Sequence, residues 1–227
     1  MKEEAWPWVQ DAKAWDVLLW KSIALVSTNI VVVQPIALYL FVLLKNYDTS
    51  QTFAIEDIPS AATLFWQLLF CFYIEDFGFS TAHRLFHQPF FYKHVHKVHH
   101  TYTQAVGVSG TYTHPVEFVI GNVLPVGLPA IILGKRMHMV TFMIWTSFRI
   151  LSTTNNHCGY DFPWIPWEIL PFKGTPSYHD YHHSGGDFAG NFSGQTNVCD
   201  SLWGTNKKYL REYLNTQRAK YAKKKDL

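Results

Sequence analysis

The spacing of the histidines constrains the fold of this chain more than any other feature of its sequence. All 12 histidines lie between His83 and His183. In two groups a histidine is followed by two more, three and four residues later, and a third group has two histidines four residues apart. On a helix, residues three and four apart lie on one face. The sequence therefore predicts helical segments that turn their histidines toward a common point.

Four segments carry this pattern or extend it. They are HRLFH (His83, His87), HKVHH (His96, His99, His100), HDYHH (His179, His182, His183) and NNHCGYD, which holds His157 and, four residues later, Asp161. Neutral imidazole nitrogens bind divalent first-row metals such as iron and zinc, and one zinc ion takes only three or four protein ligands. Nine histidines are too many for one ion and suit two. The remaining histidines are interpreted as structural: His94, His114 and His138.

The composition favours a membrane setting. Hydrophobic residues make up 48% of the 227 residues and charged residues only 16%, against about 25% in soluble domains. A mean hydropathy of -0.04 shows that much of the chain is still polar. We therefore expect an all-α integral membrane protein with a histidine-rich two-metal cap on one face of the bilayer. The net charge of +2 is too small to favour nucleic acid as a partner.

The chain is expected to form a single domain over residues 1–227, since this length supports one core. Residues 17–81 are predicted to hold the N-terminal membrane helices. Residues 83–206 form the histidine-bearing catalytic region, with a further membrane hairpin at 116–151. Residues 207–227 make a basic tail, which could face acidic lipid headgroups or an acidic electron donor.

Two apolar stretches contain helix-disrupting residues. The first runs from about residue 17 to 44, longer than the roughly 20 residues that cross a bilayer as a helix, and Pro35 is expected to kink it or to split it into a re-entrant hairpin. The second, at 116–133, contains Gly121 and Pro125. It could pair with residues 139–151 as an antiparallel hairpin or as a shallow one.

Several stretches together resemble one known family. They are IEDFGFSTAHRLFH, YKHVHKVHH, the HPVE at 114–117, HCGYDFPW from His157, HDYHH, and DSLWGT near Asp200. They resemble the fatty acid hydroxylase/sterol desaturase superfamily of membrane di-iron enzymes, and within it the 4-methylsterol oxidases. The resemblance covers roughly residues 64–205.

The resemblance implies a set of metal ligands and a cofactor. The implied ligands are His83, His87, His96, His99, His100, His157, His179, His182 and His183. Asp161 occupies the second position of a further H-x3-H pair found in some relatives, where a carboxylate could bind a metal directly or support a ligand. The implied cofactor is two iron ions, and zinc could occupy the same ligands. Four carboxylates could orient imidazole N–H groups or serve as ordinary caps and surface pairs: Glu75, Asp76, Glu117 and Asp180.

The implied enzyme is a non-haem di-iron monooxygenase that oxidises an unactivated C–H bond of a lipid with O2, as in 4-methylsterol oxidation during sterol biosynthesis. Such a bond offers no acid–base handle, so a redox metal must carry the step. The substrate is a sterol or fatty-acyl lipid. Electrons are expected to come from outside the chain, because it has no Gly-rich nucleotide fingerprint. The resemblance implies a cytochrome b-type haem protein and an NAD(P)H-dependent reductase as the donors.

Two alternatives stay open at this point. One is a sterol desaturase or fatty acid hydroxylase that uses the same metals on another lipid position. The other is a non-catalytic accessory subunit of a membrane complex, which the lack of room for a further membrane hairpin before Asp16 favours and the complete histidine groups oppose. The expected location is the endoplasmic reticulum membrane, since residues 224–227 (KKDL) resemble a dilysine retrieval signal; another intracellular membrane, such as a mitochondrial one, is the alternative.

Overall fold

The computed structural model describes residues 6–44, 53–162, 164–165, 172, 174–185, 190–213 and 215–216. Within these residues the chain is helical, without a β-strand, which confirms the expected all-α class. The α-helices are α1 (Pro7–Gln10), α2 (Ala12–Thr28), α3 (Gln34–Leu44), α4 (Ala61–Phe86), α5 (Pro89–His94), α6 (Pro115–Glu117), α7 (Leu124–Leu133), α8 (Met139–Asn156), α9 (Pro176–Ser184) and α10 (Val198–Trp203). Short 3-10 or π-helices lie between them: η1 (Asn29–Val33), η2 (Ile55–Asp57), η3 (His96–Thr101), η4 (Gly107–Thr111), η5 (Phe118–Val123) and η6 (Gly134–Arg136).

Pro35 lies inside an unbroken helical run, so the re-entrant hairpin that the sequence allowed does not form. The segments α2, η1 and α3 follow one another without a gap. Proline lacks an N–H, and its ring clashes with the carbonyl four residues earlier in an α-helix. Just before Pro35 the chain makes a π-helical turn, in which the Gln34 N–H donates to Asn29 O, five residues back. This wider turn accommodates the proline without ending the helix.

The same arrangement recurs ahead of Pro125. There η5 is a π-helix, and the Leu124 N–H donates to Val119 O, again five residues back. The two runs are long and apolar enough to cross a membrane: the most apolar 18-residue window has a mean hydropathy of 1.9 in Ala12–Leu43 and 2.0 in Pro115–Arg136. Helix α4, predicted from residues 61–81 to be a membrane helix, is not one of these two, and its crossing stays a prediction.

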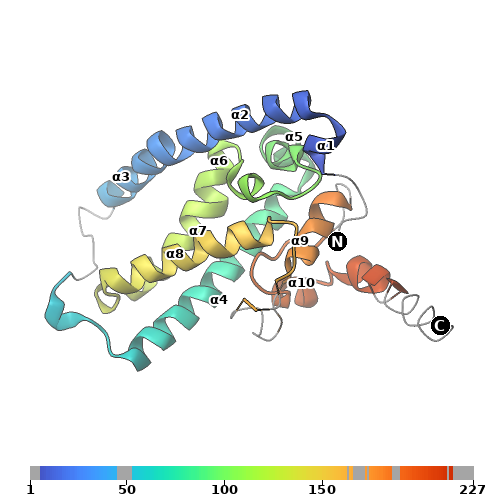
Figure 1. The fold of residues 1–227 in the computed structure, drawn as a ribbon. Helices are drawn as coiled ribbons and strands as arrows, with labels where there is room; N and C mark the ends of the chain where they lie inside the picture. Colours follow the sequence, from blue (N-terminus) through green and yellow to red (C-terminus); the bar gives the residue numbers. More distant parts are fainter. Residues whose placement is uncertain are drawn as a thin grey trace.

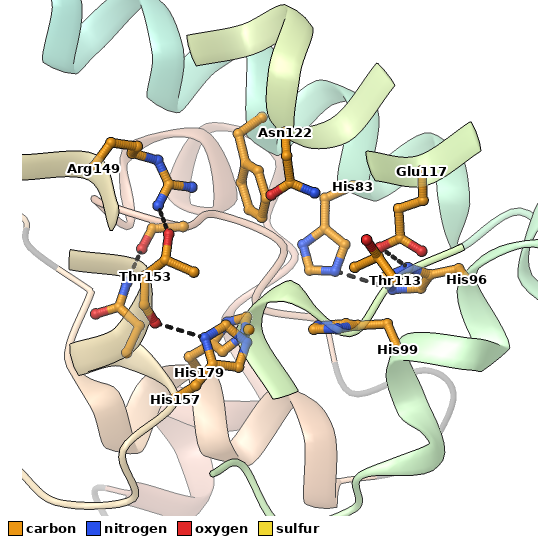
Figure 2. A pocket seen from close by; sticks show the side chains of 14 residues that line it. His83, His96, His99, Thr113, Glu117, Asn122, Arg149, Thr153, His157 and His179 are labelled. Atoms are coloured by element: carbon orange, nitrogen blue, oxygen red, sulfur yellow. Dashed lines mark hydrogen bonds and ion pairs between the residues drawn. The ribbon is translucent and has the colours of Figure 1, made fainter. Parts of the chain in front are cut away.

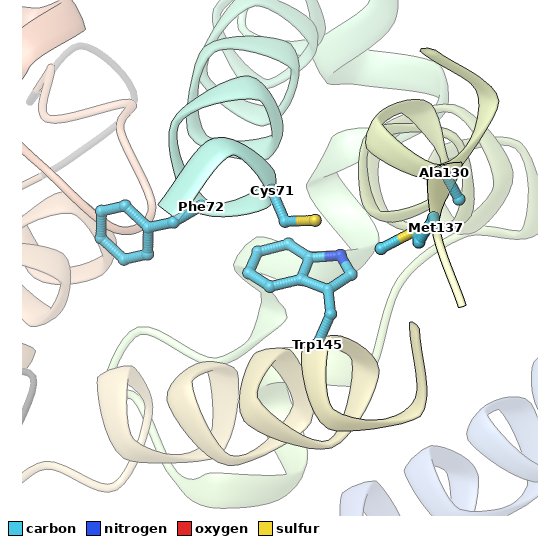
Figure 3. Close-up of a cluster of buried hydrophobic side chains, with 5 residues drawn as sticks. All are labelled: Cys71, Phe72, Ala130, Met137 and Trp145. Carbon is cyan, nitrogen blue, oxygen red and sulfur yellow. The ribbon is translucent and has the colours of Figure 1, made fainter. Parts of the chain in front are cut away.

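The main hydrophobic core joins α4, α7 and α8. Cys71 and Phe72 of α4, Ala130 of α7 and Trp145 of α8 are buried together with Met137 (Figure 3). The Trp145 indole N–H donates to a backbone carbonyl of α7, Val126 O, at 3.0 Å. Figure 1 shows these three helices packed beside one another, with α7 and α8 joined through η6. This core fixes the ends of α4 and α8, from which several histidines project.

The run α2–η1 is attached to the histidine-bearing part of the chain through two buried polar residues. Ser22 Oγ lies 2.7 Å from the Tyr102 hydroxyl, and Asn29 Nδ2 donates to Thr113 O at 2.9 Å. Both Ser22 and Asn29 are fully buried. They are seven residues apart, about two helical turns, and so lie on the same face. The opposite face is apolar and exposed, as at Trp20 and Val31.

Candidate metal centre

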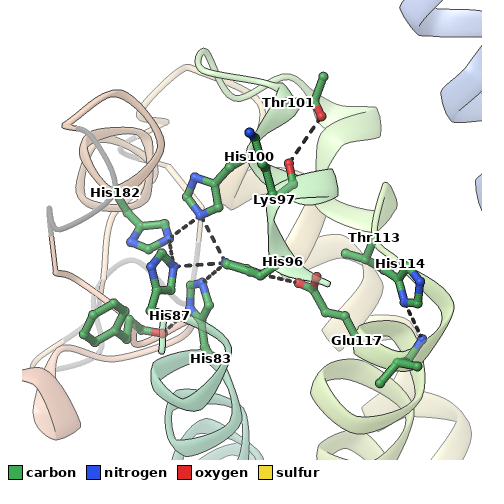
Figure 4. A network of polar contacts seen from close by, with 12 residues as sticks. His83, His87, His96, Lys97, His100, Thr101, Thr113, His114, Glu117 and His182 are labelled. Carbon is green, nitrogen blue, oxygen red and sulfur yellow. Dashed lines mark hydrogen bonds and ion pairs between the residues drawn. The ribbon is translucent and has the colours of Figure 1, made fainter. Parts of the chain in front are cut away.

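The structure gathers the nine predicted histidine ligands into two groups. In each group one ligand nitrogen per residue lies within 4.8 Å of all the others. We call the first group site A; its members are His83, His87, His96, His100 and His182. We call the second group site B; its members are His99, His157, His179 and His183. Figure 4 shows site A, where rings from three separate segments face one point.

The two three-histidine segments each supply both sites. In η3, His96 and His100 face site A, whereas His99 lies in site B. In α9 the middle histidine, His182, faces site A and its two neighbours face site B. In each segment the two histidines that are four residues apart therefore belong to one site, and the third histidine belongs to the other site. The spacing predicts the convergence, but only the packing of η3 against α9 decides this division.

Backbone carbonyls fix the orientation of the rings. In site A, Nδ1 of His83 lies 2.7 Å from Phe192 O, and Nδ1 of His182 lies 2.6 Å from Gly190 O. In site B, Nδ1 of His157 lies 2.8 Å from Thr153 O, and Nδ1 of His183 lies 3.0 Å from Tyr102 O. A carbonyl oxygen only accepts hydrogen bonds, so each of these Nδ1 atoms carries the proton and a neutral ring presents a bare Nε2 lone pair.

The distances between these nitrogens fit metal ligands. Nε2 of His96 lies 3.0 Å from Nε2 of both His87 and His100, and Nε2 of His182 lies 3.1 Å from that of His100. Two nitrogens each about 2.1 Å from one ion, and at right angles to each other, are about 3.0 Å apart. Lone pairs held face to face at this distance repel one another unless a cation lies between them. The donor set of site A therefore fits a divalent metal.

The nitrogen positions in site B also fit metal ligands. Nε2 of His179 lies 2.9 Å from Nε2 of His157. His183 Nε2 is buried and has no hydrogen-bond partner within the described residues, although its Nδ1 is engaged. A buried polar atom without a partner is costly unless something else binds it. The chemistry of site B, with four imidazoles, suits a second ion of the same kind.

Burial keeps these imidazoles neutral. It lowers the pKa of His96 and His99 to about 3, and the pKa of His157 and His182 to about 4. The cause is the loss of water around a ring that would otherwise take up a proton and a charge. Only the neutral ring has a lone pair for a metal, so near pH 7 both sites are ready to bind one.

Of the four carboxylates proposed to orient the ligands, Glu117 contacts one directly. Its Oε1 lies 2.8 Å from Nδ1 of His96 (Figure 4). Asp180 Oδ1 accepts from the Ala105 N–H, near the end of the HKVHH segment. Asp161 is in neither site: its Oδ1 accepts from the Ser177 N–H at 3.1 Å, in the first turn of α9.

The other two carboxylates, Glu75 and Asp76, hold the surroundings of the site. Glu75 pairs with Arg149 of α8, whose Nε lies 2.5 Å from Oε1. Asp76 accepts from the backbone N–H groups of Gln195 and Thr196 and from the Thr196 hydroxyl. These contacts fasten α4 to α8 and to the segment before α10, and so set the distance between the histidines that those elements carry.

Arg149 and Asp200 are structural members of the site that the sequence reasoning did not single out. Asp200 is fully buried and accepts from the N–H groups of Phe192 and Ser193 and from the Tyr178 hydroxyl. It thereby holds the loop whose carbonyls orient His83 and His182. A signal was present, since Asp200 begins the DSLWGT stretch.

The loop before α10 depends on a Gly190-Asn191 pair with unusual backbone geometry. Gly190 has φ +76° and Asn191 φ +58°, a region that glycine and asparagine adopt more readily than other residues. A Cβ at position 190 would lie 1.9 Å from Thr205 O. Only glycine fits here, and its carbonyl is the one that accepts from His182.

A pocket lies beside the two sites, between the histidines and the helices (Figure 2). His83, His96, His99, His157 and His179 line it from the metal side. Phe79 of α4, Asn122 of η5, and Arg149 and Thr153 of α8 line it from the helix side. The pocket therefore borders histidines of both sites on one side and residues of α4, η5 and α8 on the other.

The geometry defines a class of protein: a helical chain that presents two adjacent all-histidine groups, each compatible with metal binding, at the end of an apolar helical scaffold. The family comparison agrees, since the sequence pattern of the fatty acid hydroxylase family matches residues 68–205. The chain belongs to the fatty acid hydroxylase family. No solved structure matches it.

Among curated relatives, the chain is 36% identical to methylsterol monooxygenase 1-1 of Arabidopsis thaliana, over 80% of this chain and 61% of the relative. It is 35% identical to the C-4 methylsterol oxidase of Schizosaccharomyces pombe, over 72% of this chain and 54% of the relative. It is 37% identical to a very-long-chain aldehyde decarbonylase of Oryza sativa subsp. indica, over 68% of this chain and 57% of the relative. The chain thus spans between about half and three fifths of the length of these relatives.

Proposed function

We propose that the chain is a membrane-bound, O2-dependent monooxygenase that holds two iron ions in sites A and B and oxidises the 4-methyl group of a sterol. The observation that carries the proposal is the division of nine histidines, seven of them buried, into two adjacent sites. The methylsterol monooxygenase relatives support the substrate class. The endoplasmic reticulum is the proposed location.

The reaction converts R–CH3, O2, two electrons and two protons into R–CH2OH and water. When bound, the irons supply the redox chemistry that side chains lack. A cytochrome b-type protein, reduced by an NAD(P)H-dependent reductase, is proposed to supply the electrons. The chain's own residues position the reactants: the carbonyls at Phe192, Gly190, Thr153 and Tyr102 orient the ligand rings, and Phe79 places an apolar side chain on the pocket wall.

The exposed apolar helices support the membrane part of the proposal. Only 6% of the most apolar window in Ala12–Leu43 is buried within the protein, and 33% of that in Pro115–Arg136. Large apolar side chains exposed along whole helices are unfavourable in water and favourable in a bilayer. The proposed route for the lipid is from the bilayer along η5, which lies in the second of these runs and contributes Asn122 to the pocket.

A fatty-acyl lipid is the second candidate substrate. The rice relative is named as an aldehyde decarbonylase of very long chains, and its identity to this chain is close to that of the sterol enzymes. The two candidates share the metal centre and differ in the lipid.

The test begins with iron content. The full chain, purified in detergent and reconstituted in nanodiscs, is expected to hold two irons. His87→Ala, in site A, and His157→Ala, in site B, should each remove about one.

The loaded protein is then supplied with O2, a reductase system and either a 4,4-dimethylsterol or a very-long-chain fatty acid. Formation of the 4-hydroxymethyl sterol supports the proposal. Two bound irons without oxidation of either lipid would instead favour an accessory subunit.

A further inference from the structure

The pocket has polar side chains that the metal centre does not use. Thr113 and Asn156 line it and are buried (2% and 4% exposed). Thr113 Oγ1 and Asn156 Oδ1 have no hydrogen-bond partner within the described residues. Asn122 also lines the pocket. Its side chain makes no hydrogen bond to any of the described residues. We call Thr113, Asn122 and Asn156 the polar wall.

Asn122 of the polar wall comes from the helix side of the pocket. It lies in η5, inside a run apolar enough to cross a membrane, and Figure 2 shows its amide directed toward His83. π-Helical turns inside α-helices occur often at functional sites, because the extra residue re-aims a side chain. Nearby, Arg149 is already held by Glu75 and Thr153. The amide of Asn122 therefore remains available to a ligand.

A lipid that carried only hydrocarbon into this pocket would cover these atoms without binding them. Burying an amide or hydroxyl without a partner costs free energy, because the group loses its hydrogen bonds to water. A hydroxyl group removes that cost, since it can accept from an amide N–H and donate to an amide or hydroxyl oxygen. The chemistry of the polar wall thus fits a neutral group that both donates and accepts.

We propose that the polar wall, with Asn122 as its main contact, binds a hydroxyl group of the lipid substrate that lies next to the carbon being oxidised. This inference rests on the proposed function. In a 4-methylsterol the 3-hydroxyl is on the ring carbon adjacent to C4, so a group bound beside the histidines holds the 4-methyl carbon close to both sites. Asn122 then acts as a specificity residue for hydroxylated lipids. A water chain is the competing occupant of the polar wall.

The test measures equilibrium binding to the full chain in nanodiscs, by competition with a labelled sterol. The probes are a 4,4-dimethylsterol and its 3-deoxy analogue. The wild type is expected to bind the hydroxysterol about tenfold more tightly, the value of one neutral hydrogen bond in a dry site. Asn122→Leu, of similar volume, should reduce this preference to about twofold and leave binding of the 3-deoxy analogue unchanged, which also reports that the variant is folded. Thr113→Val should have a smaller effect in the same direction.

Thr154→Val is the matched control, because Thr154 is exposed on α8 and its hydroxyl donates to Ile150 O of the same helix. This variant should keep the tenfold preference. Equal binding of both sterols by the wild type overturns the inference. Water would then be the partner of the polar wall, and the proposed function would not be affected. An unchanged preference in both Asn122→Leu and Thr113→Val also overturns it. A wild type that binds neither sterol overturns the inference and the sterol substrate together.

Discussion

Glu117 Oε1 lies 2.8 Å from Nδ1 of His96, so a carboxylate from a candidate membrane-crossing helix orients a ligand of site A. A carboxylate in this position fixes the ring and increases the basicity of its other nitrogen. His96 Nε2 has three neighbours at 3.0–3.2 Å: His83, His87 and His100. The orientation of this one ring therefore affects its contacts with three of the other four ligands of site A.

The first prediction concerns this contact. Glu117→Ala should weaken metal binding at site A about 10- to 100-fold and leave site B occupied, because the ligand that Glu117 Oε1 contacts is His96 of site A. Glu117→Gln should weaken it less, since an amide oxygen still accepts from the ring. Iron retained against chelators of graded strength measures the effect. Glu56→Ala, at an exposed acid of η2, is the control. Wild-type iron retention in Glu117→Ala would contradict the role assigned here.

The second prediction concerns the attachment of α2. The Ser22 hydroxyl donates to Leu18 O, so the Tyr102 hydroxyl is the donor in their 2.7 Å contact. Ser22→Ala and Tyr102→Phe should each lower the free energy of unfolding by about 1 kcal/mol. The double variant should lose little more than either single one, because both remove the same hydrogen bond. Denaturant titration in a fixed detergent gives the three values.

Iron content provides the second measurement for this cycle. The Tyr102 carbonyl, which accepts from His183, is unchanged in Tyr102→Phe. Both variants should therefore hold as much iron as the wild type. Additive losses of stability would mean that the two hydroxyls do not interact, and loss of iron in Tyr102→Phe would mean that the side chain, and not only the backbone, supports site B.

The helical class and the convergence of the histidines could be predicted because both follow from local spacing. In a group such as HKVHH the spacing of the histidines places them on one face of a helical segment, whatever that segment packs against. The division of its members between two sites could not be predicted, because His99 and His100 are adjacent in sequence and face different sites. That choice depends on α9, about 80 residues later.

The same limit explains what the sequence concealed around the site. The carbonyl partners of His83 and His182 come from Phe192 and Gly190, and a backbone carbonyl has no sequence signature. The role of Arg149 could not be predicted from the sequence, because it depends on the ion pair with Glu75 of another helix. The π-turn before Pro35 was also hidden, since a proline in an apolar stretch ordinarily indicates a kink.

The third prediction is that acid destabilises the metal-free protein. Burial holds the pKa of His157 and His182 at about 4 in the folded chain, against about 6.5 when unfolded. Between these values the unfolded chain binds protons that the folded chain does not, so stability falls as pH falls from about 6.5 to 4. Above pH 7 these residues contribute no pH dependence. Thermal unfolding of chelator-treated protein at pH 8, 7, 6 and 5 measures the effect.

A variant with both His157→Gln and His182→Gln tests the cause of that acid sensitivity. Glutamine does not titrate, so the decline of stability between pH 6.5 and 5 should be shallower than in the wild type. A wild type equally stable at pH 8 and pH 5 would contradict the prediction. So would a decline of the same steepness in the double variant, because other groups would then be responsible.

The last prediction concerns the loop at Gly190. Gly190→Ala should lower the free energy of unfolding by roughly 2–3 kcal/mol, because an L-residue is strained at φ +76° and its Cβ would meet Thr205 O. The shifted carbonyl would no longer orient His182, so iron should fall by about one per chain, from site A. Gly127→Ala, on α7, is the matched control: nothing lies within 4 Å of the added Cβ, and alanine favours a helix. It should keep both irons and at least wild-type stability. Equal iron and equal stability in the two variants would show that the loop does not position His182.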